Sequence, residues 1–198
     1  MTSQRHILPG SRVDDDLLLD AARRCVLDIG VRRTTLTGVA RAAGVSRMTL
    51  YRRFPDVRSL LAALMTHEFG ALLGAADPGT SPTARDRLVA ATVNAVRTLA
   101  DNPLMRTVLD RDPEVMLPYL VRRIGGVQRI AEQFLREQLR AGHRDGSIRR
   151  ADRATQARTI FLVAQSFVFS MRPATSDVDK SKLIRELTHL LDATLRTP

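Results

Sequence analysis

Apolar residues recur at intervals of three or four along almost the whole chain, and glycine and proline separate the segments in which they do so. This spacing gives a helix one apolar face. No segment of the sequence shows the alternation of apolar and polar residues that a half-buried strand would need. The sequence therefore predicts an all-α fold of about nine helices.

The breaks in the apolar pattern set the expected helix boundaries. The predicted helices cover residues 14–29, 36–43, 47–54, 56–74, 83–100, 103–110, 113–141, 152–171 and 177–195. The long segment 113–141 contains Gly125 and Gly126, which predict a bend or a break there. A loop is expected from Gly142 to Ser147.

The segment from Thr35 to Tyr51 meets the steric requirements of a helix-turn-helix, a helical pair that is used to bind DNA. Ala40 is the small residue needed where the two helices approach each other, and Gly44 tolerates the positive φ of a tight turn. Thr35 and Ser46 are suitable N-caps for the two helices. The inward positions are apolar: Val39, Ala43, Val45 and Leu50. Leu18 and Ile29 of the first predicted helix are expected to cover the back of the pair.

Positive charge is concentrated around this segment. The chain has 31 basic and 21 acidic residues, a formal charge of +10. Between residues 32 and 58 there are seven arginines and a single acid, Asp56. Such charge predicts attraction to a polyanion, although a solvated basic face is the simpler alternative. A membrane-surface protein would carry its basic residues along an amphipathic helix rather than around a turn, so DNA is favoured.

The residue types at the second helix of the pair indicate how DNA would be read. This helix is expected to enter the major groove, with Arg47 on a guanine and Thr49 on a base edge or a thymine methyl group. Residues beyond them are expected to contact phosphates. The full predicted DNA-binding set is Thr35, Ser46, Arg47, Met48, Thr49, Tyr51, Arg52, Arg53 and Arg58.

From about Leu17 to Met65 the sequence resembles the TetR family of transcriptional regulators. The resemblance is carried by Thr34-Thr35, an apolar-Ala step, Ala43-Gly44-Val45-Ser46, Thr49-Leu50-Tyr51, Phe54-Pro55 and Leu60-Leu61. It implies a DNA-binding domain at residues 12–56 and a ligand-binding and dimerisation domain at residues 57–198. It also implies a homodimer on a pseudo-palindromic operator and, usually, repression relieved by a small molecule. An activator, or a regulator without a ligand, is the alternative.

Three residues depart from the family pattern. Gly38 stands where an acid usually closes a capping box on Thr35, so the second helix is expected to start more weakly. Val57 replaces a common lysine, and Arg58 beside it is expected to take over the phosphate contact. Met48 stands where a small residue is frequent, which predicts a base readout particular to this protein.

The middle of the chain offers an apolar set for an effector, and the resemblance places the effector cavity there. The candidates are Val96, Met105, Leu109, Met116, Tyr119, Leu120, Phe134, Phe161 and Phe167. The simpler alternative is that most of them form ordinary core. The expected effector is a hydrophobic small molecule, with a fatty acyl compound as the first candidate.

The last two predicted helices indicate how the chain would pair with a second copy. The final helix carries Leu183, Leu187, Leu190, Leu191 and Leu195 on one stripe, and the preceding helix is apolar on most faces from Phe161 to Met171. A helix buried all round needs partners on both sides. A four-helix dimer seam is therefore predicted.

Enzymatic and membrane functions find no support in the sequence. The four histidines are scattered, the segment Gly44–Met48 lacks the second glycine of a nucleophile elbow, and Cys25 is the only cysteine. No catalytic residue, metal or cofactor is therefore expected. The apolar stretch 160–171 is too short to span a bilayer, and the N-terminal residues 1–11 lack an apolar run. We expect a cytoplasmic protein without a membrane partner.

Overall fold

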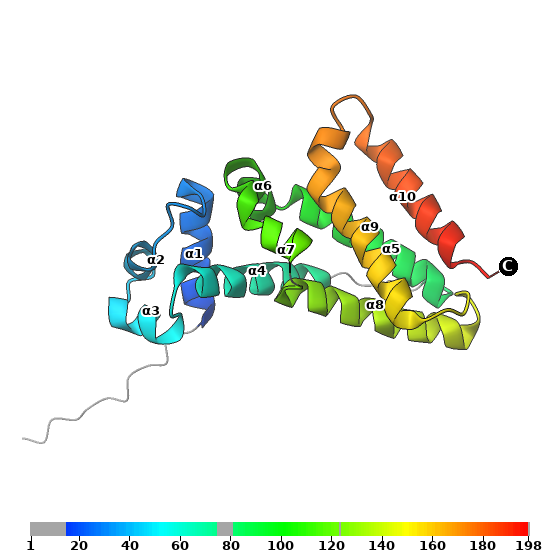
Figure 1. The fold of residues 1–198 in the computed structure, drawn as a ribbon, viewed down its shortest axis with the longest axis horizontal. Helices are drawn as coiled ribbons and strands as arrows, with labels where there is room; N and C mark the ends of the chain where they lie inside the picture. Colours follow the sequence, from blue (N-terminus) through cyan, green and yellow to red (C-terminus); the bar gives the residue numbers. More distant parts are fainter. Residues whose placement is uncertain (1–14, 75–80, 123, 198) are drawn as a thin grey trace, which may run out of the picture.

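The computed structural model describes residues 15–74, 81–122 and 124–197. The N-terminal segment and residues 12–14 of the predicted DNA-binding domain lie outside this part. All regular secondary structure in the described residues is helical, which confirms the all-α class (Figure 1). The helices are α1 (Asp15–Ile29), α2 (Leu36–Ala42), α3 (Arg47–Arg53), α4 (Val57–Gly74), α5 (Ala84–Asp101), α6 (Pro103–Arg111), the 3-10 turn η1 (Pro113–Val115), α7 (Leu117–Val121), α8 (Gly126–Asp145), α9 (Arg153–Ala174) and α10 (Lys180–Leu195).

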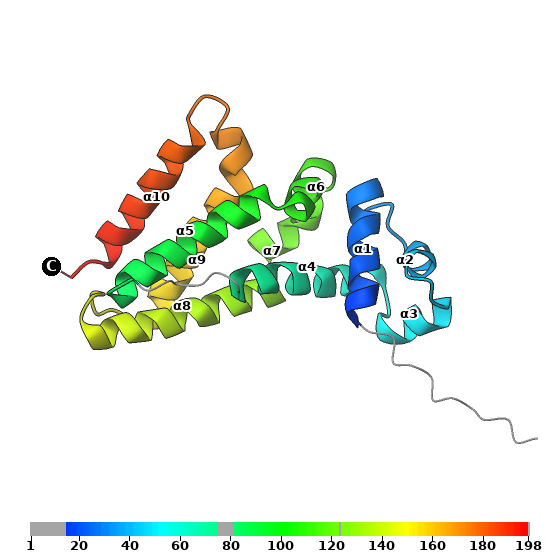
Figure 2. The same cartoon turned by 180° about the vertical axis from the view of Figure 1, so that it is seen from behind.

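The helices form a small bundle at one end of the molecule and a larger one at the other. Figure 1 shows α1, α2 and α3 together at one end, and α4 leaving them to run beneath the rest of the chain. Figure 2, from behind, shows α5 between α9 and α10, with α8 along the bottom. One continuous apolar core joins the two bundles, from Leu18 and Leu50 through Leu64 to Leu139 and Leu187. No helix in the described part of the chain is long and apolar enough to cross a membrane.

The long segment predicted at 113–141 is divided, as the paired glycines indicate. It forms η1, α7 and α8, and α8 begins at Gly126, so an additional helix is present. At Gly126 a Cβ atom would lie only 2.7 Å from Oγ1 of Thr66. The glycine therefore lets the start of α8 lie directly against α4.

The loop expected from Gly142 is shorter than predicted. α8 continues to Asp145, and the turn comes at Gly146, which has a φ of 74°. Gly142 is buried inside α8 because Ile148 packs directly on its Cα, where a Cβ would overlap the Ile148 side chain. Gly142 thus serves close packing rather than chain reversal.

α1 buries one of its two predicted residues. Leu18 is 1% exposed, as predicted, whereas Ile29, also expected to cover the back of the helix pair, is 37% exposed. Ala22 and Val26 continue the buried face from Leu18 at helical spacing. The prediction for Ile29 was wrong because α1 ends there and Gly30 turns the chain away with a φ of 83°.

The leucine stripe of α10 also faces a different partner from the one predicted. Leu187, Leu191 and Leu195 are at most 3% exposed within the protomer, because α10 packs on α5. Of the five leucines in the predicted stripe, Leu190 is exposed, at 46%. The buried leucines therefore form part of the chain's own core and are not available to a second subunit.

Candidate nucleic-acid interface

Local hydrogen bonds set the geometry of the helix pair α2–α3. The Oγ1 of Thr35 accepts a hydrogen bond from the Gly38 N–H at 3.0 Å, and the Ser46 Oγ accepts one from the Thr49 N–H at 3.1 Å. Both predicted N-caps are therefore in place. Gly44, with a φ of 68°, makes the turn, and the Val45 N–H donates to the Ala40 carbonyl at 3.0 Å.

α3 rests on the core by one face and presents the other to solvent. Leu50 is fully buried and Phe54, its C-cap, is 8% exposed. On the opposite face, Met48 is 75% and Tyr51 47% exposed, and Arg47 and Arg52 lie beside them. Residues at these spacings share one side of a helix. An exposed methionine and tyrosine between arginines form a surface that can contact both base edges and phosphates.

Three hydroxyl-bearing residues of the predicted set already have partners in the protein. The hydroxyls of Ser46 and Thr49 lie 2.8 Å apart in a mutual hydrogen bond, and Thr49 is half-buried. Thr35 is exposed, and its hydroxyl caps α2. Because a hydroxyl has two lone pairs as well as one proton, each can still accept or redirect a bond at the DNA surface.

Arg53 is held by α1. Its Nε donates to Oδ1 of Asp15 at 2.6 Å, and its Nη2 donates to the second carboxylate oxygen. This hydrogen bond from Arg53 lowers the pKa of the Asp15 carboxyl. Arg53 therefore ties α3 to the first turn of α1, and a DNA phosphate would have to share the guanidinium with Asp15.

Four arginines of this end are exposed, and their side chains form no hydrogen bond or ion pair with the described residues: Arg41, Arg47, Arg52 and Arg58. Arg41, on the last turn of α2, was not among the predicted contacts, although the density of basic residues around it was a usable signal. In contrast, Arg32 pairs with Glu114, and Arg33 donates to the Ile29 carbonyl at 3.0 Å. The basic run therefore supplies both exposed arginines without a side-chain partner and arginines that are engaged in the protein's own structure.

The end of α6 holds the end of α1. Asp112, 3% exposed, accepts a hydrogen bond from the Val31 N–H at 2.7 Å. Arg111 donates to the Asp28 carbonyl at 2.8 Å, which satisfies one of the last carbonyls of α1. At Gly30 a Cβ would lie 2.8 Å from Oδ2 of Asp112, so glycine is required for this approach. The sequence carries no local signal for this contact, because Val31 and Asp112 are 81 positions apart.

α4 makes a second connection between the two bundles. Glu68 accepts from Nε of Arg23 on α1 at 3.1 Å and from Nδ2 of Asn102 at 3.3 Å. Asn102 in turn caps α6 through the Leu104 and Met105 N–H groups. Three helices, α1, α4 and α6, are thus joined at one carboxylate.

The predicted effector-binding residues take several different positions. Val96 and Met105 are buried in the core, while Leu120 is 43% exposed on α7. The side chain of Tyr119 lies outside the described part of the structure. The others are half-buried and pack against the core: Leu109, Met116, Phe134, Phe161 and Phe167. Two hollows of about 300 and 530 Å³ lie along α8 and α9, and neither is lined by a predicted effector residue.

The described residues offer little for other chemistry. They contain no group of three His, Cys, Asp or Glu side chains placed to hold a metal ion. Cys25 is half-buried and packs against the core, as a small structural residue does.

The geometry at the α1–α3 end is that of a helix-turn-helix DNA-binding domain, and the comparisons with known proteins agree. Residues 18–64 match the family described as "Bacterial regulatory proteins, tetR family". An uncharacterised HTH-type transcriptional regulator of Mycobacterium bovis is 36% identical over 178 residues, which cover 90% of this chain and 92% of that protein. The chain belongs to the TetR family of transcriptional regulators. This family is not enzymatic, which decides against the enzyme alternative.

Solved structures share the fold at low sequence identity. The transcriptional regulator FadR from Bacillus subtilis, in complex with stearoyl-CoA, has a TM-score of 0.68 and 19% identity, covering 92% of this chain and all of that one (100%). SmeT in complex with triclosan has a TM-score of 0.64 and 20% identity, covering 92% of this chain and 91% of that one. Both alignments include the second bundle, so the fold likeness extends well beyond the DNA-binding end.

Proposed function

We propose that this regulator is a homodimeric repressor that binds a pseudo-palindromic operator and leaves it when a hydrophobic small molecule binds among the middle helices. The observation that carries the proposal is the outward face of α3. There Met48 and Tyr51 are exposed between the unpaired Arg47 and Arg52. Contact of these two exposed side chains with the base edges and backbone of a major groove would explain why they lie between arginines on the surface.

We propose that the DNA-binding domain covers residues 12–56 and the regulatory domain residues 57–198. The division falls at Pro55 and Asp56, where Asp56 caps the first turn of α4 by accepting from the Ser59 N–H at 2.7 Å. α4 then belongs to the regulatory domain, although it packs on both α1 and α8. Its position supports a role in carrying movement from one domain to the other.

The dimer is proposed to form through the outward faces of α9 and α10. Four exposed residues follow one another at helical spacing on α9 and carry no charge: Thr159, Leu162, Ser166 and Ser170. Leu162 is 53% exposed, and Leu190 on α10 is 46% exposed. In a chain with 26% charged residues, an uncharged exposed stripe of this length on a helix of 22 residues favours an interface with a second copy.

The effector is proposed to be a hydrophobic molecule, with a fatty acyl compound as the first candidate. Half-buried apolar residues from three helices, α6, α8 and α9, support this: Leu109, Phe134, Phe161 and Phe167, with Met116 between η1 and α7. Each ligand named for two regulators with the same fold has a large apolar part, namely the acyl chain of stearoyl-CoA and the aromatic rings of triclosan. A site made of half-buried side chains can open without exposing the fully buried core.

The proposed release works through a shift between two conformations. A ligand that prefers a conformation in which the two α3 helices are misplaced for successive major grooves lowers the affinity for DNA. Such coupling is about 1–3 kcal/mol and must be reciprocal. Two links support the transmission: α4 itself, and the contact of Asp112 with the Val31 N–H. Displacement of α6 by a ligand would draw the end of α1 with it.

A titration of the purified protein on its operator tests the proposal. Fatty acids and acyl thioesters of increasing chain length are added to protein bound to a fluorescent operator, and release is followed by anisotropy. The expected result is a fall in affinity of about 5- to 150-fold at saturation. A ligand that saturates the protein and leaves operator affinity unchanged is not the inducer. Tighter DNA binding with ligand would instead identify a corepressor or activator mechanism.

A further inference from the structure

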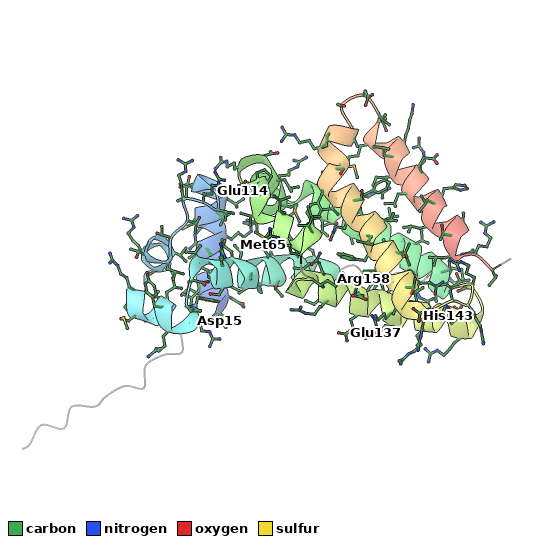
Figure 3. All side chains as sticks on the ribbon, viewed as in Figure 1. Asp15, Met65, Glu114, Glu137, His143 and Arg158 are labelled. Atoms are coloured by element: carbon green, nitrogen blue, oxygen red, sulfur yellow. The ribbon has the colours of Figure 1, made fainter. Side chains whose placement is uncertain are left out.

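Arginine side chains surround a hollow at the end of the molecule opposite α3. The hollow has a volume of about 530 Å³ and lies between the last turns of α8 and the first residue of α9. Its lining consists of Arg140, His143, Arg144, Arg150, Ala151 and Arg153. Figure 3 shows His143 at this end of the molecule and Asp15, beside the helix-turn-helix, at the other. The hollow is therefore separate from the DNA-binding face.

The arginine side chains of the hollow form no close ion pair with the described residues, although the charge of Arg153 interacts through space with the Asp152 carboxylate. The side chains of Arg140, Arg144, Arg150 and Arg153 are exposed and form no hydrogen bond or salt bridge with the described residues. The two nearby acids are engaged in local structure, because Asp145 accepts from the Ala84 and Ser147 N–H groups and Asp152 caps α9. Elsewhere in the same bundle, Arg85 pairs with Asp192, and Arg158 pairs with Glu132.

The backbone that carries these arginines is held in place. Gly142 is packed under Ile148, and Nε2 of His143 lies 2.9 Å from Oε1 of Gln156, a buried residue of α9. The Nε2 of Gln156 donates to the Arg149 carbonyl at 3.2 Å. These contacts fix the end of α8, the connecting chain and the start of α9 relative to one another. The backbone positions from which the four arginines extend are thus set before any ligand arrives, so the entropy lost on binding is mainly that of the arginine side chains.

We propose that this hollow binds a small anion that carries at least two phosphate groups. One guanidinium group can donate two parallel hydrogen bonds to two oxygens of a phosphate group. Four guanidinium groups around one hollow therefore offer more donors than a single phosphate can use, which favours a ligand with several phosphates. The volume lies within the range of small-molecule sites, about 300–1,000 Å³. Ala151 is the apolar residue of the lining, which contains no Phe or Tyr, and His143 is engaged by Gln156, so recognition falls on the phosphates.

Isothermal titration calorimetry with inorganic pyrophosphate and tripolyphosphate tests this site on the full chain at low salt. The double variant Arg144→Gln/Arg150→Gln is expected to lose at least about tenfold in affinity for either anion. The matched control, Arg24→Gln/Arg97→Gln, removes two exposed, unpaired arginines elsewhere and is expected to change the affinity by less than about twofold. All four positions are exposed, and thermal melting checks that each variant is folded.

Four results would overturn the proposal. If the control weakens binding as much as the hollow variant, the anions respond to net charge alone. If Arg47→Gln/Arg52→Gln abolishes binding and the hollow variant does not, the phosphates occupy the DNA-binding face. If orthophosphate binds as tightly as tripolyphosphate, or if duplex DNA rather than either anion requires Arg144 and Arg150, the ligand is not a small polyphosphate. If an effector fails to release the protein from its operator, the proposal of an anion site in this hollow still stands.

Discussion

At the scale of single residues, the recognition surface depends on which polar groups are already engaged. Thr49 and Ser46 share a hydrogen bond at 2.8 Å, and Arg53 is held by Asp15. Arg47 and Arg52 have no such partner among the described residues. Sequence patterns identify which residues reach the surface of α3, but not which of them the protein has already bound. The unpaired residues are therefore the best candidates for direct DNA contacts.

Replacing Arg47 by Ala should remove discrimination at one base position. Arg47 lies on the first turn of α3, which is the part of a recognition helix that reaches base edges. The expected cost is about 1–3 kcal/mol at that position. Selection from a randomised operator, followed by sequencing, measures the change in preference. Arg52→Ala is the matched control and should weaken all sequences alike; an unchanged base preference in the Arg47 variant would show that Arg47 does not read a base.

Glu132 should make the stability of the protein sensitive to acid. Its hydrogen bonds from Arg136, and then from Arg158, lower the pKa of this carboxyl below its usual value of 4.5. The unfolded chain therefore takes up a proton first, so the stabilisation is complete above pH 4.5 and is lost as the pH falls through the folded-state pKa. Urea denaturation between neutral pH and about pH 3 measures this fall in the free energy of unfolding.

The variant Glu132→Gln isolates this contribution. It should be less stable than the wild type at neutral pH, because two arginines lose their carboxylate, and its stability should fall less steeply in acid. Glu137→Gln, which changes an exposed carboxyl on the same helix, is the control. Parallel acid profiles for the wild type and Glu132→Gln would mean that other carboxylates cause the loss.

At the scale of secondary structure, the contact between α6 and α1 is the proposed coupling between the two domains. Asp112 stands at the C-cap of α6, and its carboxylate takes the first free N–H group after α1. Because Asp112 is buried and Gly30 leaves no space for a side chain, the two elements are fitted to each other. This hydrogen bond keeps its length only if the ends of α6 and α1 stay in the same relative position. A displacement of α6 would therefore be passed on to α1.

Replacing Asp112 by Ala should destabilise the protein and weaken its response to the effector. The Val31 N–H would lose its acceptor in a buried setting, at a cost of about 1–3 kcal/mol in the free energy of unfolding. The ratio of operator affinities with and without effector should move towards one. Urea denaturation and anisotropy measure the two effects.

Two control variants show whether the effect comes from the hydrogen bond of Asp112, from its negative charge, or from the loss of any acidic residue. Asp112→Asn retains a side-chain oxygen acceptor and should keep more of the stability than Asp112→Ala. Asp20→Ala removes an exposed acid of α1 and should affect neither measurement. A normal effector response in a folded Asp112→Ala protein would assign the transmission to α4 alone.

At the scale of the whole molecule, local features were predictable and long-range contacts were not. The turn at Gly44, the caps Thr35 and Ser46, and the break before Gly126 follow from a few neighbouring residues, and the structure confirms them. Contacts across the chain have no such local signature: Val31 and Asp112 are separated by 81 positions, and Arg53 and Asp15 by 38. The same reason explains α10, whose apolar stripe was recognised but assigned to a partner subunit instead of α5.

The proposed dimer gives the last prediction. A substitution at Leu187 or Leu191 cannot test it, because both side chains are core residues of the protomer and a glutamate there would unfold the chain. Leu162→Glu combined with Leu190→Glu places charge on the exposed stripe instead and should give folded monomers in light scattering. Leu117→Glu changes another exposed leucine, on α7, and should remain dimeric. The monomer should also bind the operator much more weakly, because its two half-sites are then no longer bound by one linked pair of α3 helices. A double variant that stays dimeric and folded would show that the two copies meet on another surface.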